Sequence, residues 1–348
     1  MQKRVSLAVY TFSHYCVDFA CFYMLFFGFR NSLPPAGATL DTVSMGFLLY
    51  NILAFGLQPL IGYACDARKD IPIALIGCGL LLLGLALISF PWTSLVLCAL
   101  GNACFHIGGG ISSLVQSDGK MAPSGIYVSS GAIGVSLGMM AGQSGSIPLF
   151  VPMLLITVCG ILILTLDYSP KYERPAMNFQ VANAVLPFSA VLVLCLISVV
   201  IRAYIGAAIP LAWRNTPLLI LLPGLAACAG KAAGGYIADA FGAKNTGVIT
   251  LLLSIPLLCL GYGHPVFCTV GIFLFNITMP VTLCAVASVF PYNPGLSFGL
   301  TTLGLLCGSV PTSFFVLPPA AIPAVSMLCI LASVACLSIT TVNQKENA

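Results

Sequence analysis

The sequence predicts an all-α polytopic membrane protein, with twelve transmembrane helices arranged as two pseudo-symmetric six-helix bundles. Three observations predict this architecture. Of the 348 residues, 59% are apolar and only 6% are charged. Apolar stretches of about 20 residues, the length that a spanning helix needs, follow one another along the chain. The first half of the sequence also echoes the second half.

The scarcity of charge excludes an ordinary water-soluble protein. A soluble domain carries about 25% charged residues, because its surface faces water. The net charge of +4 is not gathered into basic clusters with interleaved aromatic residues, so nucleic acid is not an expected partner. The expected surroundings of most of the surface are the hydrocarbon tails of a lipid bilayer.

The fifteen cysteines lie almost entirely within apolar runs. Buried thiols pack as small apolar groups, and no pair has the setting of a disulfide framework or the spacing of a zinc site. No nucleotide-binding loop and no Ser/His/Asp order stands in an accessible setting either. We therefore expect no metal, no cofactor and no enzymatic activity.

Charged residues and clusters of Pro, Gly and Asn divide the chain into twelve apolar segments. The first is expected to stay in the mature protein, because His14 and Asp18 would interrupt the apolar region of a cleavable signal peptide. The fifth and sixth are separated only by Gly145 to Pro148, and the ninth is short. The segments cover residues 5–29, 40–63, 71–90, 92–116, 126–146, 147–166, 184–208, 216–238, 245–262, 264–289, 295–316 and 320–342.

The basic residues of the loops give an independent test of this count. Cytoplasmic loops of membrane proteins carry an excess of Lys and Arg. With twelve spans, the side that holds both termini collects nine basic residues, and the other side has only Arg30 and Arg214. The asymmetry predicts a protein of the cell membrane with both termini on the cytoplasmic side. The nine are Lys3, Arg4, Arg68, Lys69, Lys120, Lys171, Arg174, Lys244 and Lys345.

The longest polar stretch, residues 167–180, separates six spans from six. We therefore predict an N-terminal bundle over residues 1–166, a cytoplasmic linker over 167–183 and a C-terminal bundle over 184–348.

The two halves repeat each other at a nearly constant offset. His106 in the fourth span corresponds to Asn276 in the tenth, 170 residues later, and several glycines repeat at the same offset. Gly62 and Asp66 correspond to Gly235 and Asp239 at an offset of 173. Duplication of this kind is typical of transporters that rock two similar bundles around a central site.

The segments after the second and eighth spans resemble the loop signature of the major facilitator superfamily, Gly-x-x-x-Asp followed by glycine and basic residues. The first copy lacks the later glycine and has Asp70 where a base is usual. The resemblance covers the whole chain and implies that these residues gate the cytoplasmic side, and that spans one, four, seven and ten line a cavity. The gating residues are Gly62, Asp66 and Arg68 in the first copy and Gly235, Asp239, Gly242 and Lys244 in the second.

Two further resemblances concern the direction of transport. Gly134, Gly138 and Gly142 in the fifth span are similar to the glycine ladder of antiporters in this superfamily, with Met139 in place of the customary proline. The placement of polar residues in spans one and four also resembles the fosmidomycin-resistance branch. These resemblances imply efflux by exchange.

Five ionisable residues lie inside the predicted spans, away from the first two residues of each span. A charge at the bilayer centre costs about 2.5–3.5 kcal/mol, so a retained one usually has a function. His14 and Asp18 are four residues apart on one helix face, and we predict that they form a proton-coupling pair. The alternative is a neutral hydrogen bond that joins two helices.

The other three, with Asn276, are predicted to bind the solute. Each charged or histidine residue also has a structural alternative. His106 would be a hydrogen-bond donor between helices, and Lys231 would form a structural ion pair. Arg202 would extend its side chain to the membrane surface, as snorkelling arginines do. Two cations, Arg202 and Lys231, against one carboxylate, Asp18, favour an anionic solute.

The sequence and its resemblance together predict a monomeric secondary active transporter of a small solute. Proton-coupled efflux of a drug or organic anion is favoured. The alternatives are uptake or facilitated diffusion of a small carboxylate or other metabolite, and a non-transporting membrane sensor that uses the same fold.

Overall fold

A computed structural model describes residues 2–32, 40–68, 70–166 and 177–343 of the chain. Within them, nine helices are long and apolar enough to cross a membrane, and three shorter apolar helices lie between them. These twelve helical units correspond one to one with the twelve predicted spans, so the predicted fold class is confirmed. The predicted linker lies largely outside the described residues, and the domain boundaries at 166 and 184 stay a prediction.

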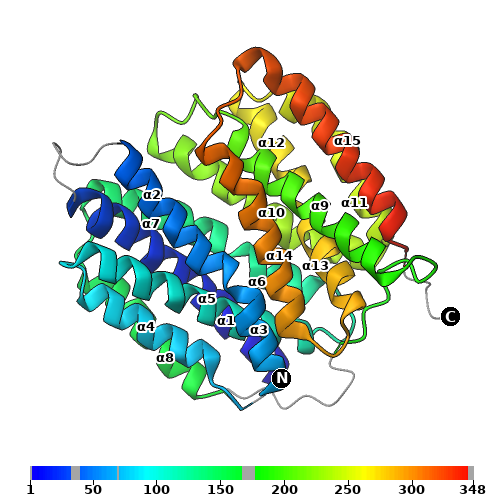
Figure 1. Cartoon of the computed structure of the whole chain (residues 1–348). Helices are drawn as coiled ribbons and strands as arrows, with labels where there is room; N and C mark the ends of the chain where they lie inside the picture. The colour runs from blue at the N-terminus through cyan, green and yellow to red at the C-terminus, as the bar shows by residue number, and fades with distance from the viewer. Residues whose placement is uncertain (1, 33–39, 69, 167–176, 344–348) are drawn as a thin grey trace.

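The first six spans form one half of the molecule (Figure 1). Several of them change helix type or break along their length. The first and second spans contain π-helical turns, η1 and η2, and the fifth is interrupted at Ser130. The elements are α1 (Gln2–Tyr23) with η1 (Met24–Arg30), α2 (Leu40–Asn51) with η2 (Ile52–Gly56) and α3 (Gln58–Ala67), α4 (Ile73–Ala86), α5 (Pro91–Val115), α6 (Ala122–Ser129) with α7 (Gly131–Ser144), and α8 (Phe150–Leu164).

The last six spans form the other half (Figure 1). Proline stands in the first turn of several of these helices, where its missing N–H costs nothing. The tenth span breaks at Ile277, next to Asn276. The elements are α9 (Phe188–Ala208), α10 (Pro217–Phe241), α11 (Ala243–Cys259), α12 (Pro265–Asn276) with α13 (Thr278–Val289), α14 (Pro294–Ser309) with η3 (Val310–Ser313), and η4 (Pro319–Ala321) with α15 (Ile322–Thr340).

Gly242 joins α10 to α11 in a connection of one residue. Its φ of +87° lies in the region that only glycine adopts readily. This member of the predicted gating motif therefore has a structural reason to be glycine, since it lets the chain reverse between two spans.

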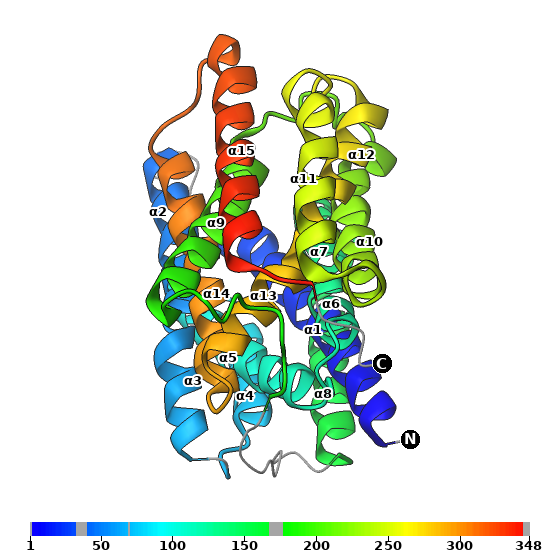
Figure 2. The ribbon, with the colours of Figure 1, turned by 90° about the vertical axis from the view of Figure 1, so that its right-hand side faces the viewer.

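The contacts between the halves follow the sequence duplication. α3 of the second span packs against α14 of the eleventh, and α10 of the eighth packs against α6 of the fifth. Figure 2 shows both neighbouring pairs. Because spans two and five correspond to spans eight and eleven in the repeat, exchanging the halves exchanges these two contacts. The interface therefore has the pseudo-twofold symmetry that was predicted.

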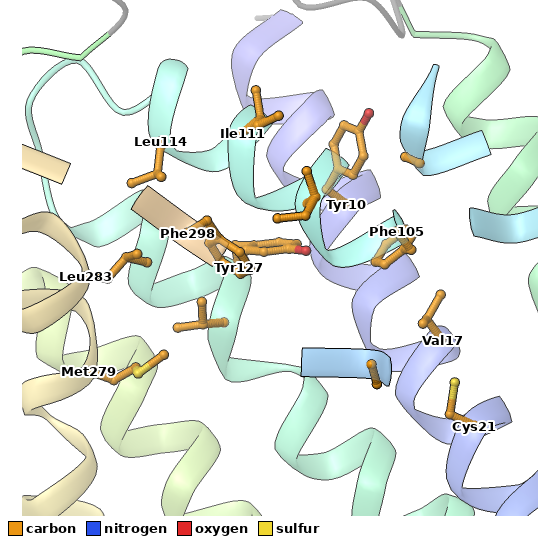
Figure 3. Close-up of a cluster of buried hydrophobic side chains, with 14 of the residues drawn as sticks. Tyr10, Val17, Cys21, Phe105, Ile111, Leu114, Tyr127, Met279, Leu283 and Phe298 are labelled. Carbon is orange, nitrogen blue, oxygen red and sulfur yellow. The ribbon is translucent and has the colours of Figure 1, made fainter. Parts of the chain in front are cut away.

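An apolar layer fills the region between the halves next to these contacts. Tyr127 of α6 and Phe298 of α14 lie with ring centroids 5.9 Å apart. Leu283 of α13 and Leu114 of α5 are buried in the same cluster (Figure 3). Side chains from both halves thus form one continuous core.

The glycine ladder of the fifth span brings α7 against α1. A Cβ at Gly138 would lie 2.9 Å from the Cα of Phe19, and it would clash with that residue's carbonyl oxygen. We expect Gly138→Val to lower the free energy of unfolding by about 1–3 kcal/mol, the usual cost of overpacking. Thermal unfolding followed by tryptophan fluorescence measures this.

The matched control is Gly79→Val in α4, where a Cβ meets nothing within 4 Å. An equal loss of stability in both variants would contradict the close packing of α1 and α7.

Candidate functional site

His14, Asp18 and His106 form a buried cluster between α1 and α5. Nε2 of His14 lies 3.3 Å from Oδ2 of Asp18, and Nε2 of His106 lies 3.6 Å from Oδ1 of the same carboxylate. The two imidazole rings meet edge to face, with centroids 4.5 Å apart. Asp18 keeps 11% of its side chain accessible and each histidine 6%, so the cluster is almost closed.

Backbone carbonyls fix the tautomer of both histidines. Nδ1 of His14 lies 2.8 Å from the carbonyl oxygen of Tyr127, and Nδ1 of His106 lies 2.9 Å from that of Asn102. A carbonyl oxygen only accepts, so each Nδ1 donates its hydrogen there. In the neutral rings each Nε2 then presents a lone pair to the Asp18 carboxylate.

Three neighbouring residues complete the surroundings of the cluster. Asn102 donates from Nδ2 to Oδ1 of Asp18 at 3.3 Å, and its own Oδ1 is buried without a hydrogen-bond partner in the described structure. The ring of Tyr127 stacks on His14 at 4.8 Å. Gly131 begins α7 directly beside the pair, where a Cβ would lie 2.6 Å from Nε2 of His14 and would clash with Oδ2 of Asp18.

Arg202 of α9 is buried to 6% exposure, so it does not snorkel to the membrane surface. Its guanidinium donates to Oγ1 of Thr282 at 3.1 Å and of Thr278 at 3.5 Å, and lies 2.8 Å from the sulfur of Met279. All three partners are uncharged. Among the residues that the structure describes, no carboxylate pairs with this cation.

Arg202 and Asn276 line a cavity of about 310 Å³ between the halves. The N-terminal half contributes residues of α7, including Ser136, and the other half contributes residues of α9, α10 and α12. Asn276 donates to the carbonyl of Ile272 in its own helix, and no residue in the described part of the chain donates to its side-chain oxygen. The remaining lining is mostly apolar, with Ile205 and Phe275 among it.

Lys231 of α10 is partly buried and lies within electrostatic range of Arg202, Asp18 and His106. No described carboxylate forms an ion pair with it, which removes the alternative of a structural salt bridge within the described residues. The structure therefore separates the predicted site residues into two groups. His106 joins the His14–Asp18 pair, whereas Arg202 and Asn276 line the cavity.

The two carboxylates of the predicted gating motif hold corresponding helix ends. Asp66 accepts from the backbone N–H groups of Gly295 and Leu296 at 2.9 and 2.8 Å, at the start of α14. Asp239 accepts from those of Met121 and Ala122 at 2.7 and 3.0 Å, at the start of α6. A carboxylate is favourable there, because helix N-termini carry free N–H groups and a positive partial charge.

The other residues of the predicted gating motif make different contacts in the structure. Gly62 packs against the backbone of Gly295, and Gly235 packs against that of Ala122, so the helices of opposite halves approach closely. The two basic residues of the motif, Arg68 and Lys244, are exposed and form no ion pair with another described residue.

Sequence reasoning missed several residues of the site. The role of the Tyr127 carbonyl and of Gly131 depends on how α1 packs against α6 and α7, for which the sequence has no local signal. Thr278 and Thr282 did have one, because residues four apart lie on one helix face and these two come two and six residues after Asn276.

Comparisons with known proteins agree with this geometry. No family model matches the chain, and no curated relative matches its sequence. Among solved structures, it is similar to the major facilitator superfamily transporter FucP in the outward conformation, with 12% identity, 97% of each chain covered and a TM-score of 0.65.

Two further solved structures are similar over 97% of this chain and 98% of their own. One is the E. coli fucose:proton symporter FucP, with 12% identity and a TM-score of 0.61. The other is a bacterial homologue of the iron transporter ferroportin in an outward-facing state, with 13% identity and a TM-score of 0.57. The chain therefore has the fold of the major facilitator superfamily.

Proposed function

We propose that this protein is a secondary active transporter of a small anionic solute, coupled to protons, and that the single chain is the unit of transport. The observation that carries the proposal is a buried cation, Arg202, whose described partners are neutral, on the wall of a cavity between two matching halves. A buried charge is costly without a counter-charge. An anion bound in the cavity supplies one.

The cavity has the dimensions and lining of a small-molecule site. Its volume of about 310 Å³ is at the lower end of the range typical of ligand pockets. Arg202 can hold a carboxylate through two parallel hydrogen bonds, and the Asn276 amide can fix a second polar group. The apolar side chains suit the body of an organic anion better than a bare inorganic ion.

Proton coupling is assigned to the Asp18–His14 pair. The lone pair of His14 Nε2 faces the carboxylate, so a proton placed between them satisfies both. Lys231 lies within electrostatic range of Asp18 and Arg202 and can link the charge state of the pair to that of the cavity. We infer exchange of the solute for protons, with net efflux, from the glycine ladder of α7, which is similar to that of antiporters. Uptake is the second candidate, since the similar FucP is a fucose:proton symporter.

We infer that the cavity opens away from the cytoplasm. Pro223 in its lining precedes Asp239 by sixteen residues of the same helix, or about 24 Å at about 1.5 Å per residue. The Asp66 and Asp239 contacts close the opposite side, which the distribution of basic loop residues assigns to the cytoplasm. Both termini lie on that side of the cell membrane in this arrangement.

A binding screen tests the anion site. Purified protein is screened by thermal shift against acidic, basic and neutral metabolites, and the affinity of any stabilising anion is then measured in Arg202→Gln. We expect about 30-fold weaker binding or more, since removing one partner of a buried charge pair costs about 2–5 kcal/mol.

The control is Arg214→Gln, which changes an exposed arginine and should leave the affinity unaltered. Stabilisation by cations or neutral solutes alone, or full anion affinity in Arg202→Gln, would overturn the assignment.

A further inference from the structure

The His14–Asp18–His106 cluster has a feature that transport of an anion does not use. Two histidine nitrogens on different helices direct lone pairs at the two oxygens of one carboxylate. A single proton between His14 and Asp18 removes the repulsion between their electron pairs. The repulsion between the electron pairs of His106 and Asp18 remains. A single cation between the three groups would accept electron pairs from all of them.

We propose that His14, Asp18 and His106 form a binding site for a divalent transition-metal ion of the zinc class. The proposal concerns equilibrium binding and does not depend on the identity of the transported solute. Because the ion uses the electron pairs that hold protons in the proposed coupling role, metal and protons exclude each other at this cluster.

The ligand set selects this class of ion. Two imidazoles and one carboxylate suit Zn²⁺, Co²⁺ and Fe²⁺, whereas Mg²⁺ and Ca²⁺ favour oxygen ligands throughout. The three ligand atoms lie within 4.8 Å of one another. Ligands of a tetrahedral ion with bonds of about 2.1 Å are about 3.4 Å apart, so side-chain movements of about 1 Å would close the site.

The surroundings already orient both histidines as metal ligands. In metal sites the second ring nitrogen usually donates to a carbonyl or carboxylate, which fixes the tautomer and the ring orientation. Nδ1 of His14 does so to the Tyr127 carbonyl, and Nδ1 of His106 to the Asn102 carbonyl. Each Nε2 is therefore held toward the centre of the cluster before any ion is bound.

A further observation points independently to a ligand at this place. The side-chain oxygen of Asn102 is buried without a partner in the described structure, while the nitrogen of the same amide contacts Asp18. Rotation of the amide would offer its oxygen as a fourth ligand. Gly131 lets α7 pack directly on His14 and Asp18, because any side chain at this position would clash with both.

The separation of the ligands along the chain explains why the sequence predicted no metal site. His14 and Asp18 are four residues apart, but His106 follows 88 residues after Asp18. No ligand spacing is visible until α1 packs against α5.

Cobalt binding tests the proposal directly. Full-length protein, purified without an affinity tag and freed of metal, is titrated with Co²⁺ and followed by its visible absorption, with Zn²⁺ as competitor. We expect one ion per chain, a spectrum of nitrogen and oxygen ligation, and displacement by Zn²⁺. Removing a group that hydrogen-bonds to a metal ligand weakens metal binding by up to about 100-fold. Removing a ligand itself should weaken it at least as much, so we expect His106→Gln and His14→Gln to bind about 100-fold more weakly or worse.

Two controls keep the result interpretable. His264→Gln removes the third histidine of the chain, which is exposed near α12, and should bind as the wild type does. The two cluster variants are tested in parallel, and each is accepted only if it elutes as the wild type and keeps its thermal transition.

Several results would overturn the proposal. They are undiminished binding in the folded cluster variants, no binding to the wild type at millimolar Co²⁺, and absorption bands of cobalt bound to thiolate, which would place the ion at cysteines. Because the titration involves no transport, failure here leaves the transport proposal intact. Metal binding to a protein that shows no pH-driven transport would support the metal site and contradict the transport proposal.

Discussion

In Asp18→Asn, we expect that a pH gradient no longer drives accumulation of the solute. A gradient of two pH units corresponds to about 2.7 kcal/mol per proton. With one proton exchanged per solute, it supports a concentration ratio of about 100 in the wild type. We expect this ratio to fall to about 1 in the variant, because asparagine keeps the shape of the side chain but cannot carry a proton. Proteoliposomes with an imposed gradient and a labelled solute measure the ratio.

The same vesicles supply the controls for this prediction. Exchange of labelled for unlabelled solute needs no net proton movement, so Asp18→Asn should retain it, which also shows that the variant is folded. His264→Gln leaves the cluster intact and should accumulate solute as the wild type does. Accumulation by Asp18→Asn to the wild-type ratio would remove Asp18 from the coupling step.

We expect Asp66→Ala to open the side of the molecule that the Asp66 and Asp239 contacts are proposed to close. The carboxylate receives two charge-assisted hydrogen bonds from the first turn of α14, and each is worth about 1.5–3 kcal/mol. A loss of about 3 kcal/mol would shift the equilibrium between closed and open forms by about 100-fold. Asp239→Ala removes the corresponding contact with α6 and should have a similar effect. The two carboxylates accept from different helix ends, so the double variant should combine the two shifts.

Spin labels across the interface measure this opening. Tyr63 on α3 and Tyr292 before α14 are exposed and belong to opposite halves, so cysteines at these positions report their separation. Replacing the exposed Cys307 removes a competing thiol. We expect one short distance in the parent protein and a second, longer population in Asp66→Ala. Asp70→Ala, which removes an exposed carboxylate from the same connection, should show the parent distribution. Identical distributions in Asp66→Ala and the parent would contradict the role of the contact.

The spans could be predicted from the sequence because each depends on a local property, the length of an apolar run. Even the fifth and sixth, divided only by Gly145 to Pro148, separate there, since Gly145 ends α7 with a φ of +61°. The breaks at Ser130 and Ile277 could not be predicted. The apolar pattern continues across them, and only packing against neighbouring helices distinguishes the two sides of each break.

The candidate site shows the same division between local and distant information. The contact of His14 with Asp18 follows from their spacing on one helix. The participation of His106 depends on the angle at which α5 crosses α1. Likewise, hydropathy placed Arg202 near the end of a span, where snorkelling is common, but the hydroxyl groups of Thr278 and Thr282 hold it inside.

The central claim is that a solute binds between the halves and moves in exchange for protons. Proton movement driven by a solute gradient tests this claim directly. Proteoliposomes that contain a trapped pH-sensitive dye, with no initial pH difference, are given a gradient of the anion identified by the thermal-shift screen. We predict that protons move against the direction of the solute in the wild type, and that the dye signal is absent in Asp18→Asn. Solute movement through the wild type with no change in internal pH would contradict the claim.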